Sequence, residues 1–252
     1  MEKLNLRLVS IAGAFAALAA PQAMAQGQPV GWAPSYTGPA APKGEFSSAN
    51  LTGWTLSGAN LKEAKLDYSV MRDVKAVGVN LEKADLTGAD MRGAVLTNAR
   101  VSSAIFDLAR MQDVKAPGAD FRNARLHGVN MHGAEMVGAT FEGAELFIAR
   151  LEEAQFGGSN FSSALLDRAV LRGAVFDGAN FTDARLVRAD ITGASFRDAR
   201  FPGANLQNVI GFDQADFEGA CGSLTTQLPP DERLPLCTPA QLTARLTIGR
   251  QD

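Results

Sequence analysis

The sequence predicts an all-β solenoid, because two periods run through it from Phe46 to Leu206. Every position whose number ends in 1 or 6 is the centre of a five-residue unit, and 31 of the 33 centres carry Phe, Leu, Met, Ile or Val. Two residues before the centre, 25 of the 33 positions carry Ala. A period of five matches neither the helical 3.6 nor the strand period of 2. A repeat kept in one register from Phe46 to Leu206 instead indicates short units that stack on one another.

A second period of twenty is superimposed on the first. Residue types recur at this interval in several sets of centres: Phe121, Phe141, Phe161, Phe181 and Phe201; Phe156, Phe176 and Phe196, with Phe217 one residue late; Met71, Met91, Met111 and Met131. We interpret the recurrence as contact between residue n and residue n+20, so that the chain closes one circuit every four units. The units then make about eight coils, and at ~4.8 Å per coil the rod is about 40 Å long.

The positions within each unit have different roles. The centres and the Ala residues point inward and fill the interior with ladders of like side chains, in which aromatic rings and Met side chains pack well. Gly follows many centres by two positions, as at Gly88 and Gly128, where a turn requires free φ. No coil can bury its own inner face, so stability comes from stacking on neighbouring coils.

Units such as "ANLKE", "ADLTG", "ADMRG", "ADFRN" and "ANFTD" share the pattern A-(D/N)-(L/F)-x-x. On this pattern the chain resembles the pentapeptide repeat family over residues 45–220. The resemblance implies a right-handed quadrilateral β-helix in which the centre and the Ala two residues before it point inward. The handedness and the square cross-section rest on the resemblance, whereas the spacing gives only four units per circuit.

Residues 1–25 are predicted to be a signal peptide. Lys3 and Arg7 provide a positive start, residues 8–20 form a short apolar run, and an A-x-A cleavage site occupies residues 23–25. The run is shorter than the roughly 20 residues that a membrane-spanning helix needs. We therefore expect cleavage after Ala25 and a periplasmic or secreted protein with no integral membrane span in its mature chain.

Residues 26–44 contain four Pro and four Gly in 19 positions and are predicted to form an extended linker. Its Trp32 and Tyr36 either dock on the solenoid or stay exposed. At the start of the solenoid, Trp54 replaces the usual inward Ala. We expect its indole to lie across the mouth of the first coil, with a tolerated irregularity as the alternative.

Residues 221–252 are predicted to cap the last coil. Cys221 and Cys237 are the chain's only cysteines, and a single even pair in a secreted protein is expected to form a disulfide. Two free buried thiols are the alternative. Closing this loop would contribute roughly 3 kcal/mol on the chain-entropy model.

A short helix is predicted after the second cysteine. Thr238 and Pro239 suit its N-cap and first position. Leu242 and Leu246, four residues apart, would give the helix one apolar face to cover the last coil. Members of the pentapeptide repeat family are similar in having terminal caps.

The sequence contains no pattern typical of catalysis or of cofactor binding. Gly-x-Ser-x-Gly, Walker and dinucleotide-binding motifs do not occur in it. The only histidines, His127 and His132, fall on adjacent outward sides without a clear third ligand, so we expect no metal site. We therefore expect a protein that is not an enzyme and that uses no cofactor.

The charge of the chain argues against nucleic-acid binding. Removing Glu2, Lys3 and Arg7 with the signal peptide takes away one net positive charge and changes the formal net charge from −3 to −4. Nucleic-acid binding needs a basic face, and here the outward Arg residues alternate with acids. We expect no nucleic-acid partner.

Outward apolar residues gather on one side of the predicted solenoid, the side whose centres include 106, 126, 146, 166 and 186. They are Ile105, Leu108, Phe147, Ile148, Leu165 and Val187. Because an exposed apolar patch marks an interaction surface, we predict contact with an unknown protein partner or a second copy. Alternatively such residues simply suit strands, which explains Val well but Phe147 and Leu108 poorly.

The favoured interpretation is a non-catalytic structural or protein-interaction module of the periplasm or the extracellular space. The alternative is a DNA mimic that inhibits a topoisomerase, as gyrase-directed cytoplasmic relatives in the family do. The predicted signal peptide and the mixed surface charge make that alternative the weaker one.

Overall fold

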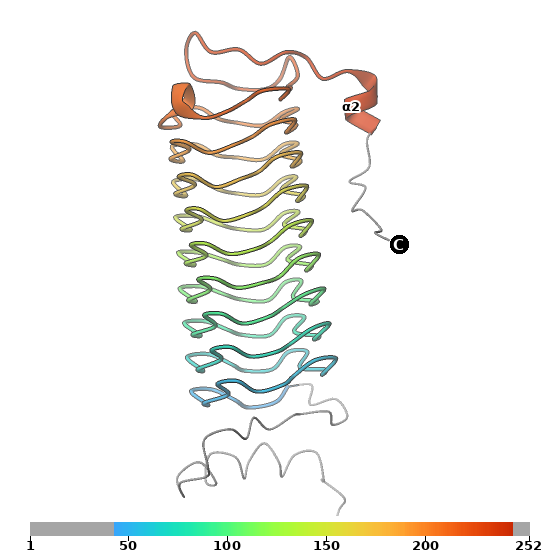
Figure 1. The fold of residues 1–252 in the computed structure, drawn as a ribbon, viewed down its shortest axis with the longest axis vertical. Coiled ribbons are helices and arrows are strands. Elements are labelled where there is room, and N and C mark those ends of the chain that lie inside the picture. Colours follow the sequence, from blue (N-terminus) through green and yellow to red (C-terminus); the bar gives the residue numbers. More distant parts are fainter. Residues whose placement is uncertain (1–42, 244–252) are drawn as a thin grey trace, which may run out of the picture.

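A computed structural model describes residues 43–243, which form one long rod of stacked coils (Figure 1). Residues n and n+20 form parallel β-bridges, from Glu45↔Lys65 to Asp190↔Ile210. The predicted contact between successive circuits is therefore confirmed. The predicted signal peptide, Trp32 and Tyr36 lie outside the described residues. No helix within residues 43–243 is long and apolar enough to span a bilayer.

Hydrogen bonds join each side of a coil to the coils before and after it. The N–H of Phe121 donates to the C=O of Thr140 at 2.7 Å, and the N–H of Asp120 donates to the C=O of Ala99 at 2.9 Å. The same pattern recurs along the rod. A side of one short unit cannot satisfy its backbone groups internally, so the neighbouring coils provide their partners.

The interior consists of ladders of like residues. Every centre from Leu51 to Leu206 is buried. In one ladder the rings of Phe121, Phe141 and Phe161 stack with successive centroids 4.8 Å apart and interplanar angles of 8° and 2°. A second ladder meets the first edge to face, as at Phe161 and Phe176, whose ring planes are inclined by 73°. The predicted inward positions are thus confirmed. The interior is filled with apolar groups except at Ser69 and Ser159, whose hydroxyl groups donate to backbone C=O groups.

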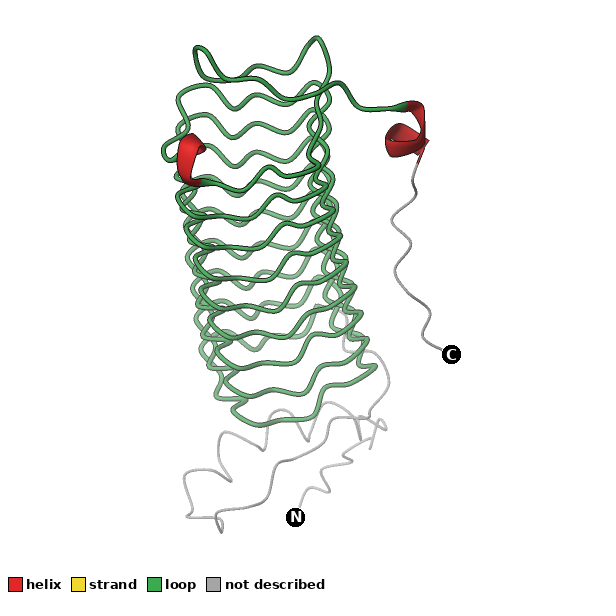
Figure 2. Ribbon diagram, turned by 45° about the horizontal axis from the view of Figure 1, so that its top comes forward, coloured by secondary structure: helices red, strands yellow, loops and turns green. Residues whose placement is uncertain are grey.

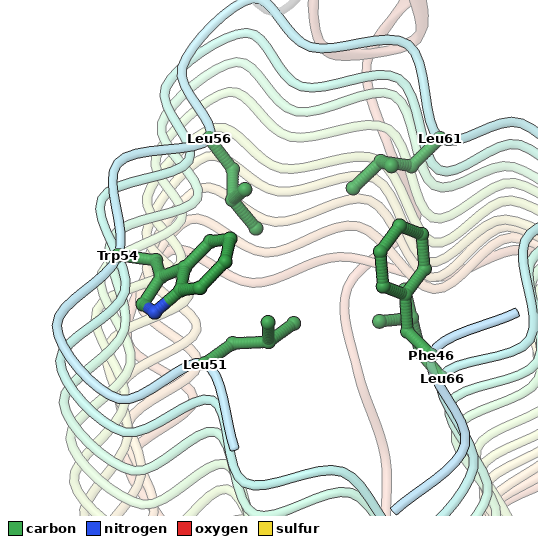
Figure 3. Close-up of a pocket in the computed structure, with 6 residues that line it drawn as sticks. All are labelled: Phe46, Leu51, Trp54, Leu56, Leu61 and Leu66. Atoms are coloured by element: carbon green, nitrogen blue, oxygen red, sulfur yellow. The ribbon is translucent and has the colours of Figure 1, made fainter. Parts of the chain in front are cut away.

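At the N-terminal end, Trp54 lies inside the first coil among Phe46, Leu51, Leu56 and neighbouring leucines (Figure 3). These residues line a cavity of about 10 Å³, too small for a ligand. The indole points into the interior and is 3% exposed, and its Nε1 has no hydrogen-bond partner among residues 43–243. The first coil thus accommodates a ring where later coils hold the smaller Val or Ala.

At the C-terminal end one circuit of the chain is a residue longer than the circuits before it. The bridge Ser195↔Asp216 is one position longer than the bridges before it, and the short 3-10 helix η1 (Phe212–Gln214) accommodates the additional residue. The chain then continues into a loop in which Cys221 and Cys237 form a disulfide with their Cα atoms 4.8 Å apart. Cys221 is buried beside the last coil.

The helix α2 (Pro239–Thr243) does not cover the last coil, which corrects the sequence prediction for its described part. Figures 1 and 2 show α2 beside the end of the rod. None of its residues is buried, and Leu242 is 57% exposed. A helix this short, with one large apolar side chain, cannot form an apolar face. Leu228 and Leu234 of the preceding loop pack against the core instead. Leu246 lies outside the described residues.

Ion pairs tie neighbouring coils together on the outer surface. The carboxylate of Asp90, which is 10% exposed, accepts hydrogen bonds from Arg92 and Arg72, each with an N–O distance of 2.8 Å. The hydrogen bonds from Arg92 and then from Arg72 outweigh the opposing effect of burial and hold the pKa of Asp90 well below its usual range. This carboxylate stays ionised and paired at all but strongly acidic pH.

We expect Asp90→Asn to lower the free energy of unfolding at pH 7 by about 1 to 3 kcal/mol, because two guanidinium groups lose the negative charge and one of the two oxygens that accept their hydrogen bonds. The folded-state pKa lies below the unfolded-state pKa. The pair therefore stabilises the fold above pH 4 and loses this effect as the pH falls through the folded-state value. Urea unfolding from pH 7 to pH 2 should show the two proteins converging in acid. A difference that is the same at both pH values would contradict the assignment.

Candidate interaction surface

Each side of a coil ends in a residue with left-handed backbone conformation, two positions after the centre. We call it the corner residue. Glycine fills many corners, as at Gly53 with φ of 71°. Asn and Asp are the next most suitable residues, because their short polar side chains tolerate this conformation. Many corners of the described coils nevertheless hold a non-glycine residue with positive φ.

Among these non-glycine corner residues, only Tyr68, Leu108 and Ile148 are apolar or aromatic, with φ of 56°, 59° and 53°. All three occupy corners of the same side, which we call the first side and whose centres run from Phe46 to Leu206 in steps of twenty. They stand two coils apart and are 65%, 67% and 47% exposed. A β-branched residue such as Ile148 is a conformational outlier at a left-handed position.

Glycines in the intervening coils make room for these side chains. A Cβ atom at Gly88 would lie 2.8 Å from two ring carbons of Tyr68. At Gly128 it would lie 3.0 Å from Leu108 Cδ2 and 3.9 Å from Ile148 Cδ1. Leu108 and Ile148 therefore converge over Gly128, and large side chains alternate with Gly along the corner. We call Tyr68, Leu108 and Ile148 the apolar corner column.

Phe147 extends this column onto the first side. It is 38% exposed, and its ring packs edge to face with His127 at a centroid distance of 6.4 Å. Nε2 of His127 is 2.9 Å from Oε2 of Glu145, so the imidazole is fixed beside the ring. The guanidinium carbon of Arg168 lies 5.9 Å from the ring centroid, within the range of a cation–π contact.

The structure brings together part of the predicted patch. Leu108, Phe147 and Ile148 form one exposed surface, and Val187 lies two coils further along. Ile105 and Leu165 are half-buried bridge residues and are separated from each other by Arg125 and Glu145. They do not join the exposed surface.

Sequence reasoning missed Tyr68. The signal was available, because Tyr68 precedes Leu108 by two circuits, the same interval that separates Leu108 from Ile148. The prediction considered outward apolar residues together and did not separate corner positions from bridge positions.

On the rest of the described surface, the features that bear on function are metal-ligating groups and exposed apolar residues. Within residues 43–243, no group of three or more His, Cys, Asp or Glu residues is arranged to hold a metal ion. Exposed apolar residues elsewhere on the coils, such as Val77 and Val137, occupy a different side.

Two models of pentapeptide repeats match the chain. The first matches with eight copies over residues 45–81, 77–113, 104–143 and 149–186. The second matches with nine copies over residues 176–221. The chain belongs to the pentapeptide repeat family. Family membership implies a right-handed β-helix for the rod.

Several solved pentapeptide repeat structures are similar to this chain. A trypsin-treated variant of QnrB1, a plasmid-mediated fluoroquinolone resistance protein, is 20% identical, with 76% of this chain and 90% of that chain covered and a TM-score of 0.53. HetL of the cyanobacterium Nostoc, which is involved in heterocyst differentiation regulation, is 25% identical with 77% and 94% covered and a TM-score of 0.44. No curated protein sequence matches significantly.

We expect Ile148→Asn to raise the free energy of unfolding by about 1 kcal/mol, because Asn tolerates the left-handed conformation that a β-branched residue resists. The matched control is the reverse change at another side, Asn123→Ile, which should destabilise by a similar amount since Asn123 has φ of 54°. Urea unfolding measures both. Destabilisation by Ile148→Asn would show that Ile148 serves the fold and not a contact.

Proposed function

We propose that this pentapeptide repeat protein is a non-catalytic interaction module that binds a protein partner, or a second copy, through its first side. The observation that carries the proposal is the apolar corner column. Tyr68, Leu108 and Ile148 occupy left-handed corners and are exposed to solvent. Left-handed conformation is unfavourable by about 1–2 kcal/mol for most residues. Conformational strain of this kind gathers at functional positions.

The exposure of these side chains supports the same conclusion. A buried Ile or Leu compensates for local strain through packing, but Leu108 at 67% exposed gains little from burial in the free protein. Apolar groups exposed together on one face are typical of a surface that another molecule covers. A partner on the first side would bury all three.

We further propose that the protein acts in the periplasm or outside the cell. The predicted signal peptide, residues 1–25, supports this location, although it lies outside the described residues. The disulfide between Cys221 and Cys237 is typical of an oxidising compartment.

The alternative, a topoisomerase-directed DNA mimic, finds less support. Such a mimic needs a surface of one negative sign, and the first side carries Arg125, Arg168, Arg185 and Arg188 among its acids. The likeness to QnrB1 is one of fold at 20% identity. Nothing on the described surface favours the mimic over the interaction module.

A photo-crosslinking amino acid at position 108 tests the proposed surface. In cells of the native host we expect it to form protein adducts, whether with a partner or with a second copy. The same amino acid at position 137, where Val is 53% exposed on another side, is the matched control and should form none. Ile148→Asn should abolish the adducts from position 108. Equal adducts from both positions, or none from position 108, would contradict the proposed surface.

Cell fractionation tests the proposed location separately. The cleaved chain should appear in the periplasm or the medium. An uncleaved chain confined to the cytoplasm would contradict this part of the proposal and would favour the topoisomerase alternative.

A further inference from the structure

Beyond the apolar corner column, the first side carries a hollow. Asp167 lies between Phe147 and Val187, one coil from each. Its carboxylate turns toward Arg185, with an Oδ2–Nε distance of 2.7 Å, and the residue is only 7% exposed. A short, retracted side chain between two larger apolar ones leaves a depression. Its lining is Phe147, Asp167, Arg168, Val187, Arg188 and Asn208.

Two arginines that form no ion pair with another described residue flank this hollow. Nine other arginines within residues 43–243 form ion pairs with Asp or Glu, as Arg185 does with Asp167. In the same range no ion pair involves Arg168 or Arg188. They are successive corner residues, with φ of 57° and 61°. Because Arg185 already neutralises Asp167, the hollow carries an excess of positive charge that suits a carboxylate.

The spacing along the corner matches the repeat of one extended ligand, a polyproline II helix. Successive coils are about 5 Å apart, as the stacked phenylalanine rings show with centroid distances of 4.8 to 5.2 Å. Tyr68, Leu108 and Ile148 are two coils apart, so their spacing is roughly 10 Å. A polyproline II helix rises ~3.1 Å per residue with three residues per turn, so every third side chain returns to the same face after ~9.3 Å. A β-strand alternates its faces every two residues and does not fit this spacing.

Arg168 and Arg188 continue this spacing along the corner. Arg188 follows Ile148 by two coils, and Arg168 lies midway between them. In a bound polyproline II helix, the residue three places beyond the one on Ile148 would therefore lie beside Arg188, within reach of both guanidinium groups. A ligand with apolar residues at positions i, i+3 and i+6 and an acidic residue at i+9 matches the first-side corner residues from Tyr68 to Arg188.

We propose that the first side recognises an extended polyproline II segment of a partner protein, with an apolar residue at every third position and an Asp or Glu at the next third position. The apolar residues would lie on Tyr68, Leu108 and Ile148, and the carboxylate would lie between Arg168 and Arg188. This inference rests on the proposed function, since it assigns a ligand class to the same surface.

Labelled synthetic peptides test the inference with the purified full chain. The peptides are LPPLPPLPPE and its reverse EPPLPPLPPL, because a polyproline II helix can dock in either direction. Fluorescence anisotropy should show saturable binding of at least one of them. The isomer PPPLLLPPPE, of the same composition, should bind with an affinity at least about fivefold lower. Replacing Glu by Gln should lower the affinity to a similar degree.

A charge reversal in the protein provides a second arm. The double variant Arg168→Glu and Arg188→Glu should no longer bind the acidic peptide. It should instead bind the peptide in which Lys replaces Glu, LPPLPPLPPK or its reverse, according to the direction that binds the unmodified protein. Val137→Asn, on another side, should leave binding unchanged.

Two results would overturn the inference. One is that neither acidic peptide binds. The other is that the clustered isomer or the Gln peptide binds as tightly as the matched peptide. If position 108 still forms adducts in the crosslinking experiment, the ligand class is wrong and the proposed surface stands. If position 108 forms no adducts and the peptides also fail, the proposed surface is wrong as well.

Discussion

The left-handed corner residue is the constraint on which the whole molecule depends. A chain can turn after every five-residue unit only if one residue in each unit adopts positive φ, and the corners from Ser48 to Asn208 do so in succession. Once the corners are fixed, the centre and the residue two places before it must point inward, and residue n must meet residue n+20. The stacked rings of Phe121 and Phe141 and the backbone bridges follow from that geometry.

The same constraint governs the outer surface. A corner side chain can lean over the corner of the next coil, and where that corner is Gly the side chain occupies the space that a Cβ atom would take. The position of a Cβ at Gly93 lies 2.5 Å from Oδ1 of Asp73, and the position at Gly143 lies 2.5 Å from Oδ1 of Asn123. On the other three sides of the described coils the non-glycine corner residues are polar. The first side alone uses corners to expose apolar groups, so this feature is additional to what the fold requires.

The repeat made most of the fold predictable, because centres, inward positions and the twenty-residue circuit all follow from spacing. The ends were less predictable, since they have no repeat. Leu242 and Leu246, four residues apart after the second cysteine, indicated a helical cap. Leu228 and Leu234 of the loop pack on the core instead, and α2 stays exposed. On the surface, sequence placed Phe147 and Ile148 together. Position within the unit distinguishes Ile105, directly before its centre, from Tyr68, two places after its centre, but how far each side chain is exposed depends on the folded backbone.

The central claim is that the apolar corner residues of the first side lower the free energy of unfolding. The most direct test replaces Tyr68, Leu108 and Ile148 by Asn in turn, with the Asp corner residues as controls, and measures the free energy of unfolding of every variant. The account predicts gains at Tyr68, Leu108 and Ile148, with changes near zero at the corners that hold Asp. Losses of stability at these three positions, equal to those of ordinary packing residues, would contradict it.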